Sequence, residues 1–187
     1  MARSDDLYSL PEGLPVPVED GACAHLLGAR LAAVMLVSTR GRRVDVSAIV
    51  GRVVVYAYPR TGVPDHDPPA GWDLIPGARG CTPQSCAYRD HHAELRALGA
   101  EVFGVATNPP EYQREVAERL HLPFELLSDE HFELADAMRF PTFEIGGMRL
   151  LRRFTLIARG GVIERVHYPV FPTDGDAGRV LEYLGKR

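Results

Sequence analysis

The stretch RVVVYAY, residues 52–58, leads through a loop at residues 59–80 into the segment CTPQSCAYRDHHAELRAL, which begins at Cys81. β-Branched and aromatic residues fill the first stretch, and such a run predicts a strand that is buried on both faces. Residues 82–98 have a helical pattern, in which Thr82 can cap the helix, Pro83 suits its first position and Gly99 ends it. A buried strand that leads into a helix is the beginning of an α/β fold.

The same alternation continues outward from this stretch. We expect further strands at residues 102–107 and 124–127, and helices at 110–120, at 129–138 with Ser128 as its cap, and at 177–184. Hairpins are predicted at residues 31–46, turning at 39–41, and at residues 153–167, turning at 159–161. This order resembles the thioredoxin plan: a three-layer α/β sandwich with a mixed, mostly parallel central sheet, flanking helices and an N-terminal β-hairpin extension.

A single domain accounts for the 187 residues, which suffice to bury a sizeable core. Residues 1–30 contain the stretch LPEGLPVPVEDG and are expected to form an N-terminal extension packed on the domain. Residues 31–187 would then form the thioredoxin-like domain.

Composition excludes several classes of function. A net charge of −4 gives no electrostatic reason to expect a nucleic-acid partner. No apolar run is long enough to cross a membrane, and the acidic residues near the N-terminus favour a cytoplasmic protein over a secreted one. Three cysteines are a small and odd number, which argues against a secreted disulfide scaffold. Two of them lie close together in the sequence, which points to redox chemistry or a metal.

Cys81 lies where the predicted helix begins. Free backbone N–H groups and the positive end of the helix dipole favour a thiolate at this place, and the thiolate is the nucleophilic form of cysteine. Arg79 lies two residues away and is a further positive charge. Most buried cysteines are inert, but a helix start that follows a loop rich in Pro and Gly favours a reactive Cys81.

Cys86 follows five residues later. On a regular helix the two Cα atoms would be about 8 to 9 Å apart, whereas a disulfide requires less than about 7 Å. A redox-active pair therefore requires the start of the helix to unwind. In the wound form Cys81 would be oxidised to a sulfenic acid, and after unwinding Cys86 would condense with it to a disulfide.

The loop at residues 59–80 is long for a compact domain, and such loops often serve as lids or binding loops. The alternative is a tolerated surface insertion. Trp72, the only tryptophan, would either shield the site and select bulky substrates or simply hold the loop in place.

The active-site region resembles that of Q-type, or bacterioferritin-comigratory, peroxiredoxins of the AhpC/TSA family, and the resemblance runs from about residue 31 to the C-terminus. The matching segments are Tyr58-Pro59, the stretch GCTPQSCAYRD at 80–90, GVAT at 104–107, LLSDE at 126–130 and RFT at 153–155.

This resemblance implies an enzyme that reduces hydrogen peroxide and organic hydroperoxides. It makes Cys81 the peroxidatic cysteine and Cys86 the resolving cysteine, with thioredoxin or a similar dithiol as reductant. Arg153 would steady the thiolate and polarise the peroxide, with its neighbour Arg152 as the competing candidate. The resemblance implies no cofactor and no metal, and a monomer or weak dimer.

One departure from the family pattern concerns the residue three positions before Cys81. The family has a threonine there, and this chain has Ala78. The loop reads as a large insertion inside the motif, so that Thr61 could fold back to supply the missing hydroxyl. Pro59 and Thr82 complete the expected substrate-binding set.

Other interpretations use the same cysteines. A zinc site of Cys81, Cys86, His91 and His92 is disfavoured, because adjacent histidines on a helix point about 100° apart. A thioredoxin-like disulfide oxidoreductase would use the shorter Cys-x-x-Cys spacing. A non-catalytic redox sensor stays open. Cys23 has no partner in the sequence and is expected to be a structural or surface thiol.

Overall fold

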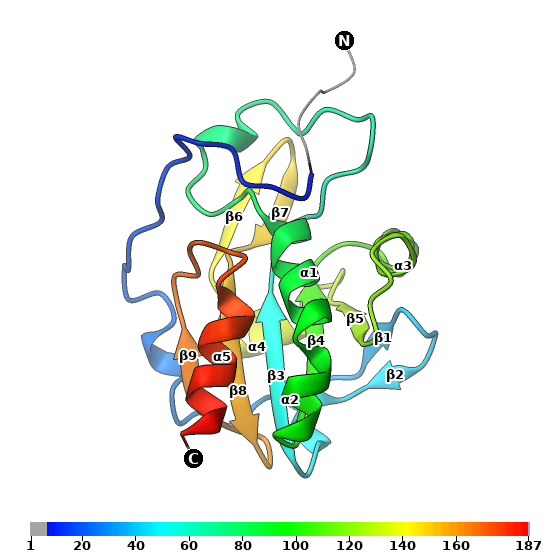
Figure 1. Cartoon of the computed structure of the whole chain (residues 1–187), viewed down its shortest axis with the longest axis vertical. Coiled ribbons are helices and arrows are strands. Elements are labelled where there is room, and N and C mark those ends of the chain that lie inside the picture. Colours follow the sequence, from blue (N-terminus) through cyan, green and yellow to red (C-terminus); the bar gives the residue numbers. More distant parts are fainter. Residues whose placement is uncertain (1–6, 187) are drawn as a thin grey trace.

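The computed structural model describes residues 7–186, which form a seven-stranded mixed sheet and a separate two-stranded sheet (Figure 1). The strand order in the large sheet is β2-β1-β5-β4-β3-β8-β9. Its central strands β3 (Arg52–Ala57), β4 (Ala100–Ala106) and β5 (Glu125–Ser128) are parallel. The remaining strands pair antiparallel: β8 (Phe154–Arg159), β9 (Val162–His167), β1 (Leu36–Ser38) and β2 (Arg43–Val44).

The predicted α/β class with a mixed central sheet is therefore confirmed. The expectation of a mostly parallel sheet is wrong, because only the pairs β3–β4 and β4–β5 are parallel, while the edge strands all pair antiparallel. The expected N-terminal hairpin exists, but its strands are much shorter than residues 31–46 allow. Its strand β1 also pairs with β5, so the hairpin extends the main sheet.

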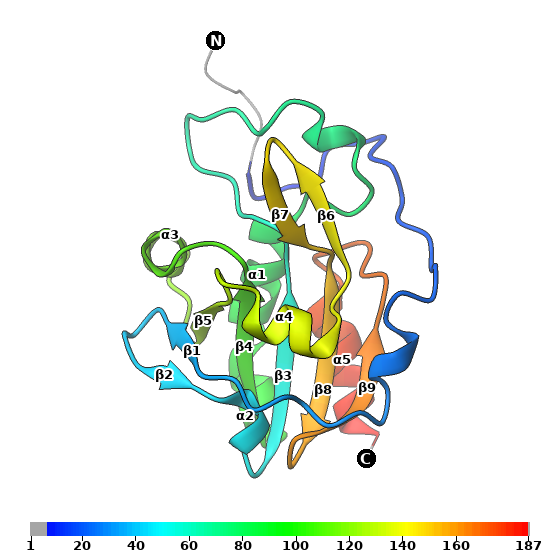
Figure 2. The ribbon, with the colours of Figure 1, turned by 180° about the vertical axis from the view of Figure 1, so that it is seen from behind.

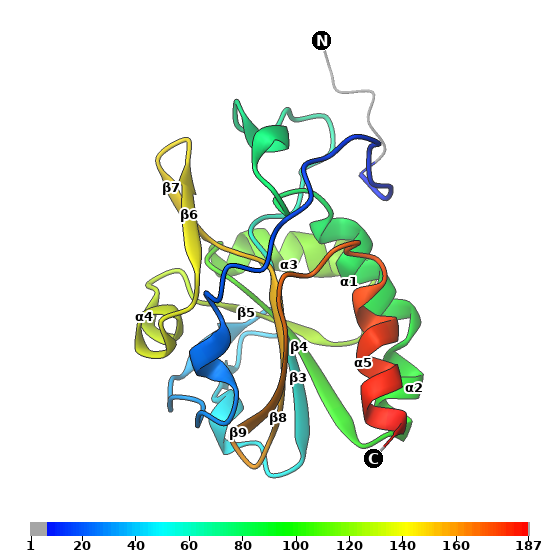
Figure 3. The same ribbon diagram turned by 90° about the vertical axis from the view of Figure 1, so that its left-hand side faces the viewer.

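Successive residues of β3 point alternately into two hydrophobic cores, because side chains alternate between the two faces of a sheet along a strand. Val54 and Tyr56 face one core, and Val53 and Val55 face the other. The first core is covered by α1 (Cys81–Asp90), α2 (His92–Ala97), α3 (Pro110–Arg119) and α5 (Asp176–Gly185). The second is covered by α4 (Glu133–Met138) and two short 3-10 helices, η1 (Ala24–Leu26) and η2 (Val46–Ala48). Figure 3 shows α1, α2 and α5 on one side of the sheet and α4 on the other.

Two helices begin differently from the predictions. The helix expected at residues 82–98 begins at Cys81 and is interrupted at His91, which divides it into α1 and α2. The helix expected to follow Ser128 begins only at Glu133, because Ser128 belongs to β5. Its first N–H groups are capped by the carboxylate of Asp129, which accepts hydrogen bonds from the amides of Leu134 and Ala135.

A hairpin that the sequence analysis did not identify lies above α4, as Figure 2 shows from behind. It consists of β6 (Thr142–Ile145) and β7 (Met148–Leu151), joined by the Gly146–Gly147 turn. Its apolar side chains pack against Trp72 and Ala78 of the 59–80 loop. The hairpin thus supports the loop that precedes Cys81.

The N-terminal residues from Leu7 onward run across the same loop (Figure 1). Leu7 lies against Gly62, Leu10 against Gly80 and Pro17 against Gly77. Further along, Arg30 forms an isolated bridge with Val162 of β9. Within residues 7–186 no helix is long and apolar enough to cross a membrane.

Candidate active site

Cys81 is the first residue of α1, and Gly80 precedes it in a left-handed conformation with φ of 98°. A Cβ at Gly80 would collide with the side chains of Thr173 and Leu10, so both the backbone and the packing require glycine here. Gly80 offers no side chain to cap the helix, which leaves the first N–H groups of α1 without a capping side chain. The positive end of the helix is therefore directed at the Cys81 sulfur.

Thr82 is consequently the second residue of the helix and not its cap, and Pro83 is the third residue and not the first. The prediction placed the cap and the first helical residue two residues too late. A left-handed glycine can begin a helix without a polar side chain, which the capping pattern does not reveal.

Arg153 contacts the Cys81 sulfur directly. Its Nη2 atom donates to Sγ of Cys81 over 3.1 Å. Only 4% of the side chain is exposed, and its remaining donors are taken by the carbonyl oxygens of Gly77, Ala78 and Arg79 and by Oε1 of Gln84. A buried guanidinium held by so many acceptors has little freedom to turn away from the sulfur.

Arg152 lies elsewhere. Its side chain is exposed and donates to the backbone oxygen of Thr142 in β6. Of the two arginines that the sequence left in competition, the structure brings Arg153 to Cys81 and directs Arg152 away from it.

A second layer of polar groups lies behind Arg153. Gln84 accepts from Arg153 and donates through Nε2 to Oδ2 of Asp176 over 2.9 Å. The same carboxylate oxygen accepts from the hydroxyls of Tyr88 and Thr155. Burial alone would raise the pKa of Asp176, but the neighbouring His167 and the hydrogen bonds from Thr155, Gln84 and Tyr88 outweigh it and hold that pKa below its usual range.

A cavity of about 380 Å³ opens beside Cys81. The N-terminal segment, the 59–80 loop, the start of α1, α3 and β7 all contribute to it. Its lining residues are Leu7, Ser9, Arg60, Thr61, Gly62, Val63, His66, Asp67, Pro68, Pro69, Trp72, Ala78, Arg79, Gly80, Cys81, Thr82, Tyr112 and Met148. Most of this wall is apolar.

Thr61 lies in the wall of this cavity, as its predicted role requires. The side chain is 1% exposed, and its hydroxyl has no hydrogen-bond partner within residues 7–186. A buried hydroxyl without a partner costs free energy, and this one belongs to a residue that lines the cavity. Tyr112 fixes the Thr61 backbone by donating to its carbonyl oxygen over 2.6 Å.

Pro59 and Ala78 occupy supporting positions. Pro59 is buried outside the cavity wall, and its carbonyl accepts from Asn108. Ala78 is buried, and its carbonyl oxygen lies 3.7 Å from Sγ of Cys81, which donates to it. The backbone of Ala78 thus contacts the thiol, but its side chain provides no hydroxyl.

Trp72 and Arg79 are held by partners in and beside the loop. Trp72 is buried against Phe143 of β6 and also lines the cavity, so it both holds the loop and shapes the site. Arg79 forms a two-armed ion pair with Asp73. Its backbone oxygen, rather than its charge, contacts Arg153.

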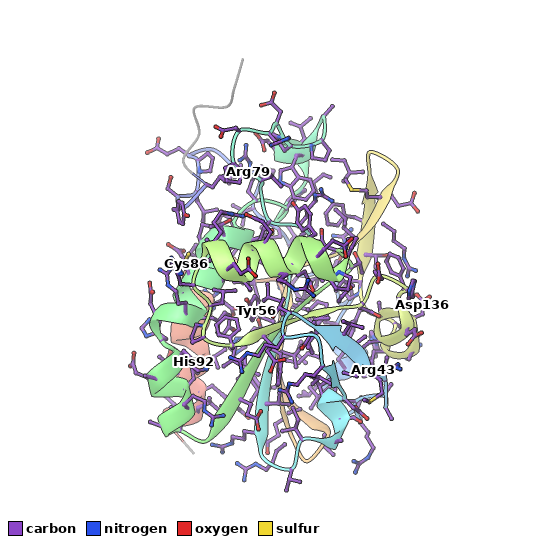
Figure 4. The ribbon with its side chains drawn as sticks, turned by 90° about the vertical axis from the view of Figure 1, so that its right-hand side faces the viewer. Arg43, Tyr56, Arg79, Cys86, His92 and Asp136 are labelled. Atoms are coloured by element: carbon purple, nitrogen blue, oxygen red, sulfur yellow. The ribbon has the colours of Figure 1, made fainter. Side chains whose placement is uncertain are left out.

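Cys86 lies farther along α1. Its side chain is half-buried and packs against the core beneath α1, and burial raises the pKa of its thiol. Figure 4 shows Arg79 in the loop at the top, Cys86 on α1 near one end of α3, and Tyr56 further inside. Tyr56 stacks on Tyr88 and lies within 3.0 Å of the Ser85 hydroxyl, so this part of α1 is firmly attached to the sheet.

Cys23 belongs to a different environment. It is buried in the opposite core, beside η1, and burial raises the pKa of its thiol to about 12. All three cysteines are free thiols in this structure.

The residues of the zinc alternative do not converge. The His91 ring hydrogen-bonds the carboxylate of Glu94, and His92 packs against the ring of Phe124. Within residues 7–186 no group of three or more His, Cys, Asp and Glu side chains is arranged to hold a metal ion.

Sequence reasoning missed Gln84 and Asp176. Gln84 is a polar residue one helical turn before Tyr88, on the buried face of α1, and a buried glutamine within a reactive segment is a usable signal. Asp176 is far away in sequence, and only the packing of α5 against α1 brings it to the site.

Comparison with known proteins places these residues in a family. The model of the AhpC/TSA family matches residues 74–166, which include Cys81, Cys86 and Arg153. The chain is 30% identical over 145 residues to the chloroplastic peroxiredoxin Q of Sedum lineare, covering 77% of this chain and 69% of that protein. It is also 30% identical over 145 residues to peroxiredoxin Q of Oryza sativa subsp. japonica, and spans 59% of the length of that relative.

Solved structures show the same fold. The crystal structure of peroxidoxin BcpB from Mycobacterium tuberculosis superimposes with a TM-score of 0.69 at 24% identity, and the match covers 86% of this chain and 96% of that one.

Proposed function

The chain belongs to the peroxiredoxin Q branch of the AhpC/TSA family, and from this premise we propose that it is a thiol peroxidase with Cys81 as its peroxidatic residue. The observation that carries the proposal is the contact of 3.1 Å between Nη2 of Arg153 and Sγ of Cys81 at the start of α1. A cationic donor and a helix N-terminus stabilise negative charge on that sulfur.

In the first step the Cys81 thiolate attacks one oxygen of the peroxide. The O–O bond breaks, the attacked oxygen stays on sulfur as a sulfenic acid, and the other oxygen leaves as water or an alcohol after taking up a proton. Arg153 polarises the peroxide as charge develops on the leaving oxygen. The unpartnered hydroxyl of Thr61 is the group in the cavity wall that would hydrogen-bond the peroxide in place of the threonine replaced by Ala78.

In the second step Cys86 resolves the sulfenic acid. Both cysteines lie in α1, and a regular helix separates their Cα atoms by about 8 to 9 Å, beyond disulfide range. The first turns of α1 therefore unwind, the Cys86 thiolate attacks the Cys81 sulfur, and the hydroxyl group leaves as water. Burial raises the pKa of the Cys86 thiol while α1 is wound, and unwinding removes that burial.

A dithiol reductant of the thioredoxin class then restores both thiols. One of its thiolates attacks the disulfide to give a mixed disulfide, and its second thiol releases the reduced peroxidase. An unwound and exposed Cys81–Cys86 segment offers the access that this exchange requires.

The size and lining of the cavity support the reduction of organic hydroperoxides as well as hydrogen peroxide. At about 380 Å³ it is much larger than one hydrogen peroxide molecule, and Leu7, Trp72 and Met148 supply apolar surface in its wall. An alkyl or aryl group would occupy that surface while the peroxide oxygens reach Cys81.

The test is NADPH-coupled peroxide consumption with thioredoxin and its reductase, using wild type, Cys81→Ser and Cys86→Ser. We expect turnover to vanish with Cys81→Ser. With Cys86→Ser we expect one equivalent of peroxide to be consumed without recycling through thioredoxin.

The other possible outcomes of this assay point to different functions. Sustained turnover in Cys86→Ser would assign resolution to Cys23 or to an external thiol. Oxidation of Cys81 without turnover in the wild type would make the protein a redox sensor. Disulfide exchange without peroxide consumption would make it a thioredoxin-like oxidoreductase.

A further inference from the structure

Asp176 is an acidic residue buried to 0% exposure at the first position of α5. One of its oxygens, Oδ2, accepts hydrogen bonds from Gln84, Tyr88 and Thr155, at distances of 2.9, 2.9 and 2.7 Å. The basic side chains near its other oxygen, Oδ1, are His167, with Nδ1 at 3.6 Å, and Arg179, with Nη2 at 4.0 Å, and within residues 7–186 Oδ1 has no hydrogen-bond partner. Burying a carboxylate is costly, and the three donors on Oδ2 offset part of that cost.

A continuous chain of contacts leads from this carboxylate to the reactive sulfur. Asp176 accepts from Nε2 of Gln84, Oε1 of Gln84 accepts from Nη1 of Arg153, and Nη2 of Arg153 donates to Cys81. The amide of Gln84 has one donor end and one acceptor end. With Asp176 on its nitrogen side, its oxygen must face Arg153.

Without this fixed acceptor, the amide of Gln84 would be free to rotate. A rotated amide would present its NH₂ group to the guanidinium, and two donors facing each other would push Arg153 away from its position. The orientation of Arg153 thus depends on a residue that makes no contact with the sulfur.

We propose that Asp176 is a positioning residue of this site, which holds Gln84 and, through Gln84, holds Arg153 against Cys81. The inference rests on the proposed peroxidase function for its kinetic consequence, but its geometric part stands independently. Because Gln84 lies between the two cysteines, the hold lasts only while α1 is helical.

Two variants distinguish a positioning role of Asp176 from an effect of its negative charge on Cys81. Asp176→Asn keeps an oxygen that can accept from Gln84, Tyr88 and Thr155, and places its NH₂ group toward His167. Asp176→Ala removes the acceptor altogether. A nearby negative charge disfavours a thiolate, so if charge alone mattered, both variants would increase the thiolate population of Cys81.

Asp129→Ala is the matched control. Asp129 is also buried, to 1% exposure, but it caps α4 on the opposite face of the sheet and does not contact this hydrogen-bond chain. Its loss is expected to lower thermal stability by an amount similar to the loss of Asp176, without moving Arg153.

The experiment uses the full chain with Cys23→Ser and Cys86→Ser, so that Cys81 is its only thiol. The thiolate absorbance of Cys81 at neutral pH, its rate of alkylation by iodoacetamide, and its rate of oxidation by hydrogen peroxide are measured in each variant, together with the melting temperature.

We expect Asp176→Ala to lower the alkylation and peroxide rates by about 10-fold, the loss expected when a charge-assisted hydrogen bond is misplaced. Asp176→Asn should restore both rates to within about threefold of the parent, since its oxygen preserves the hydrogen bonds. Asp129→Ala should change the melting temperature only.

Three results would overturn the proposal. A thiolate population that rises in both Asp176 variants would indicate a charge effect. Rates unchanged in Asp176→Ala despite a lower melting temperature would indicate a purely structural residue. Equal loss of rate in Asp129→Ala would indicate general destabilisation. If alkylation responds as expected while no variant, nor the parent, reacts with peroxide, the peroxidase function fails and the positioning role stands.

Discussion

The two ends of the CTPQSC segment place the same side chain in opposite settings. At Cys81 the sulfur lies at the open end of a helix, beside a cavity and within 3.1 Å of Nη2 of Arg153. At Cys86 the sulfur lies along the helix, half-buried against apolar side chains, where burial raises the pKa of the thiol. The setting of Cys81 offers donors to the sulfur, whereas the setting of Cys86 offers mainly apolar contacts.

The contrast shows that the position of a cysteine in a helix changes the groups that surround its sulfur. The first turn offers free N–H groups and the dipole, and both are lost five residues farther along. The same regular helix keeps the two Cα atoms beyond disulfide range, so in the proposed mechanism Cys86 reacts with Cys81 only after the helix opens. The following predictions alter one side of this contrast at a time.

The largest effect is expected on the Cys81 side, from Arg153→Met. This change removes the cationic donor and should lower the second-order rate constant for peroxide by about 100- to 1000-fold, as the loss of a preorganised donor does in other active sites. Stopped-flow measurement of Cys81 oxidation by hydrogen peroxide provides the rate.

Arg152→Met is the matched control, because Arg152 is the adjacent arginine and points away from the site. Its rate should stay within about twofold of wild type, as expected for an exposed side chain. Equal losses in the two variants would refute the assignment of Arg153.

Cys23 extends the contrast to a third thiol. Its pKa is raised to about 12 by burial, so the thiolate fraction near neutral pH is far below that of an exposed cysteine. In native protein that lacks Cys81 and Cys86, we expect iodoacetamide to alkylate Cys23 at least about 100-fold more slowly than a free thiol. Mass spectrometry over time measures this, and rapid labelling in the native fold would contradict the buried position.

Thr61→Val removes a hydroxyl that has no protein partner within residues 7–186. We expect the peroxide rate constant to fall by about 10-fold, because a hydrogen bond to the developing charge is lost. The melting temperature should stay level or rise, because an unsatisfied buried hydroxyl is replaced by a methyl group.

Thr61→Ser restores the hydroxyl and should recover most of the peroxide rate. If Thr61→Val reacts with peroxide at the wild-type rate, the Thr61 hydroxyl takes no part in the reaction and does not replace the threonine that the family has at position 78.

The smallest effect is expected on the Cys86 side, from Ser85→Ala. This change removes the contact of 3.0 Å with the hydroxyl of Tyr56 and so weakens the wound form of α1. A loss of about 1 kcal/mol would speed disulfide formation from the sulfenic acid by about fivefold. The interval between sulfenic acid and disulfide in rapid-quench mass spectrometry measures the rate.

Ser38→Ala is the control, because Ser38 is equally buried but belongs to β1. It should leave disulfide formation unchanged. If Ser85→Ala forms the disulfide at the same rate as wild type, unwinding of α1 does not limit resolution.

Local pattern was enough to predict the sheet, because its central strands are continuous apolar runs. The segment at residues 52–58 and the strand β3 (Arg52–Ala57) differ by one residue. The β6–β7 hairpin was missed, although Gly146 and Gly147 mark its turn, because its strands are short and largely half-buried. The two buried residues of β7, Leu150 and Leu151, are adjacent in the sequence, so the segment lacks the alternation that identifies a strand.

The site was predictable where a single short segment carries it, and unpredictable where tertiary packing assembles it. The sequence placed Cys81 at a helix start and proposed that Thr61 folds back into the site, and the structure puts Thr61 in the cavity wall. The resemblance favoured Arg153 over Arg152, and in the structure it is Arg153 whose guanidinium contacts the Cys81 sulfur. Asp176 carries no local signal, because its role arises from the packing of α5 on α1.

The central claim is that Cys81 is oxidised and Cys86 resolves it, and peptide mapping tests this most directly. Cleavage after Arg79 and Arg89 releases both cysteines in one peptide, GCTPQSCAYR. After one equivalent of peroxide, the account predicts that this peptide has lost two hydrogen atoms in the wild type. In Cys86→Ser it should instead carry one added oxygen on Cys81. A disulfide joining this peptide to the one that contains Cys23, or an unmodified peptide with the oxidation elsewhere, would contradict the account.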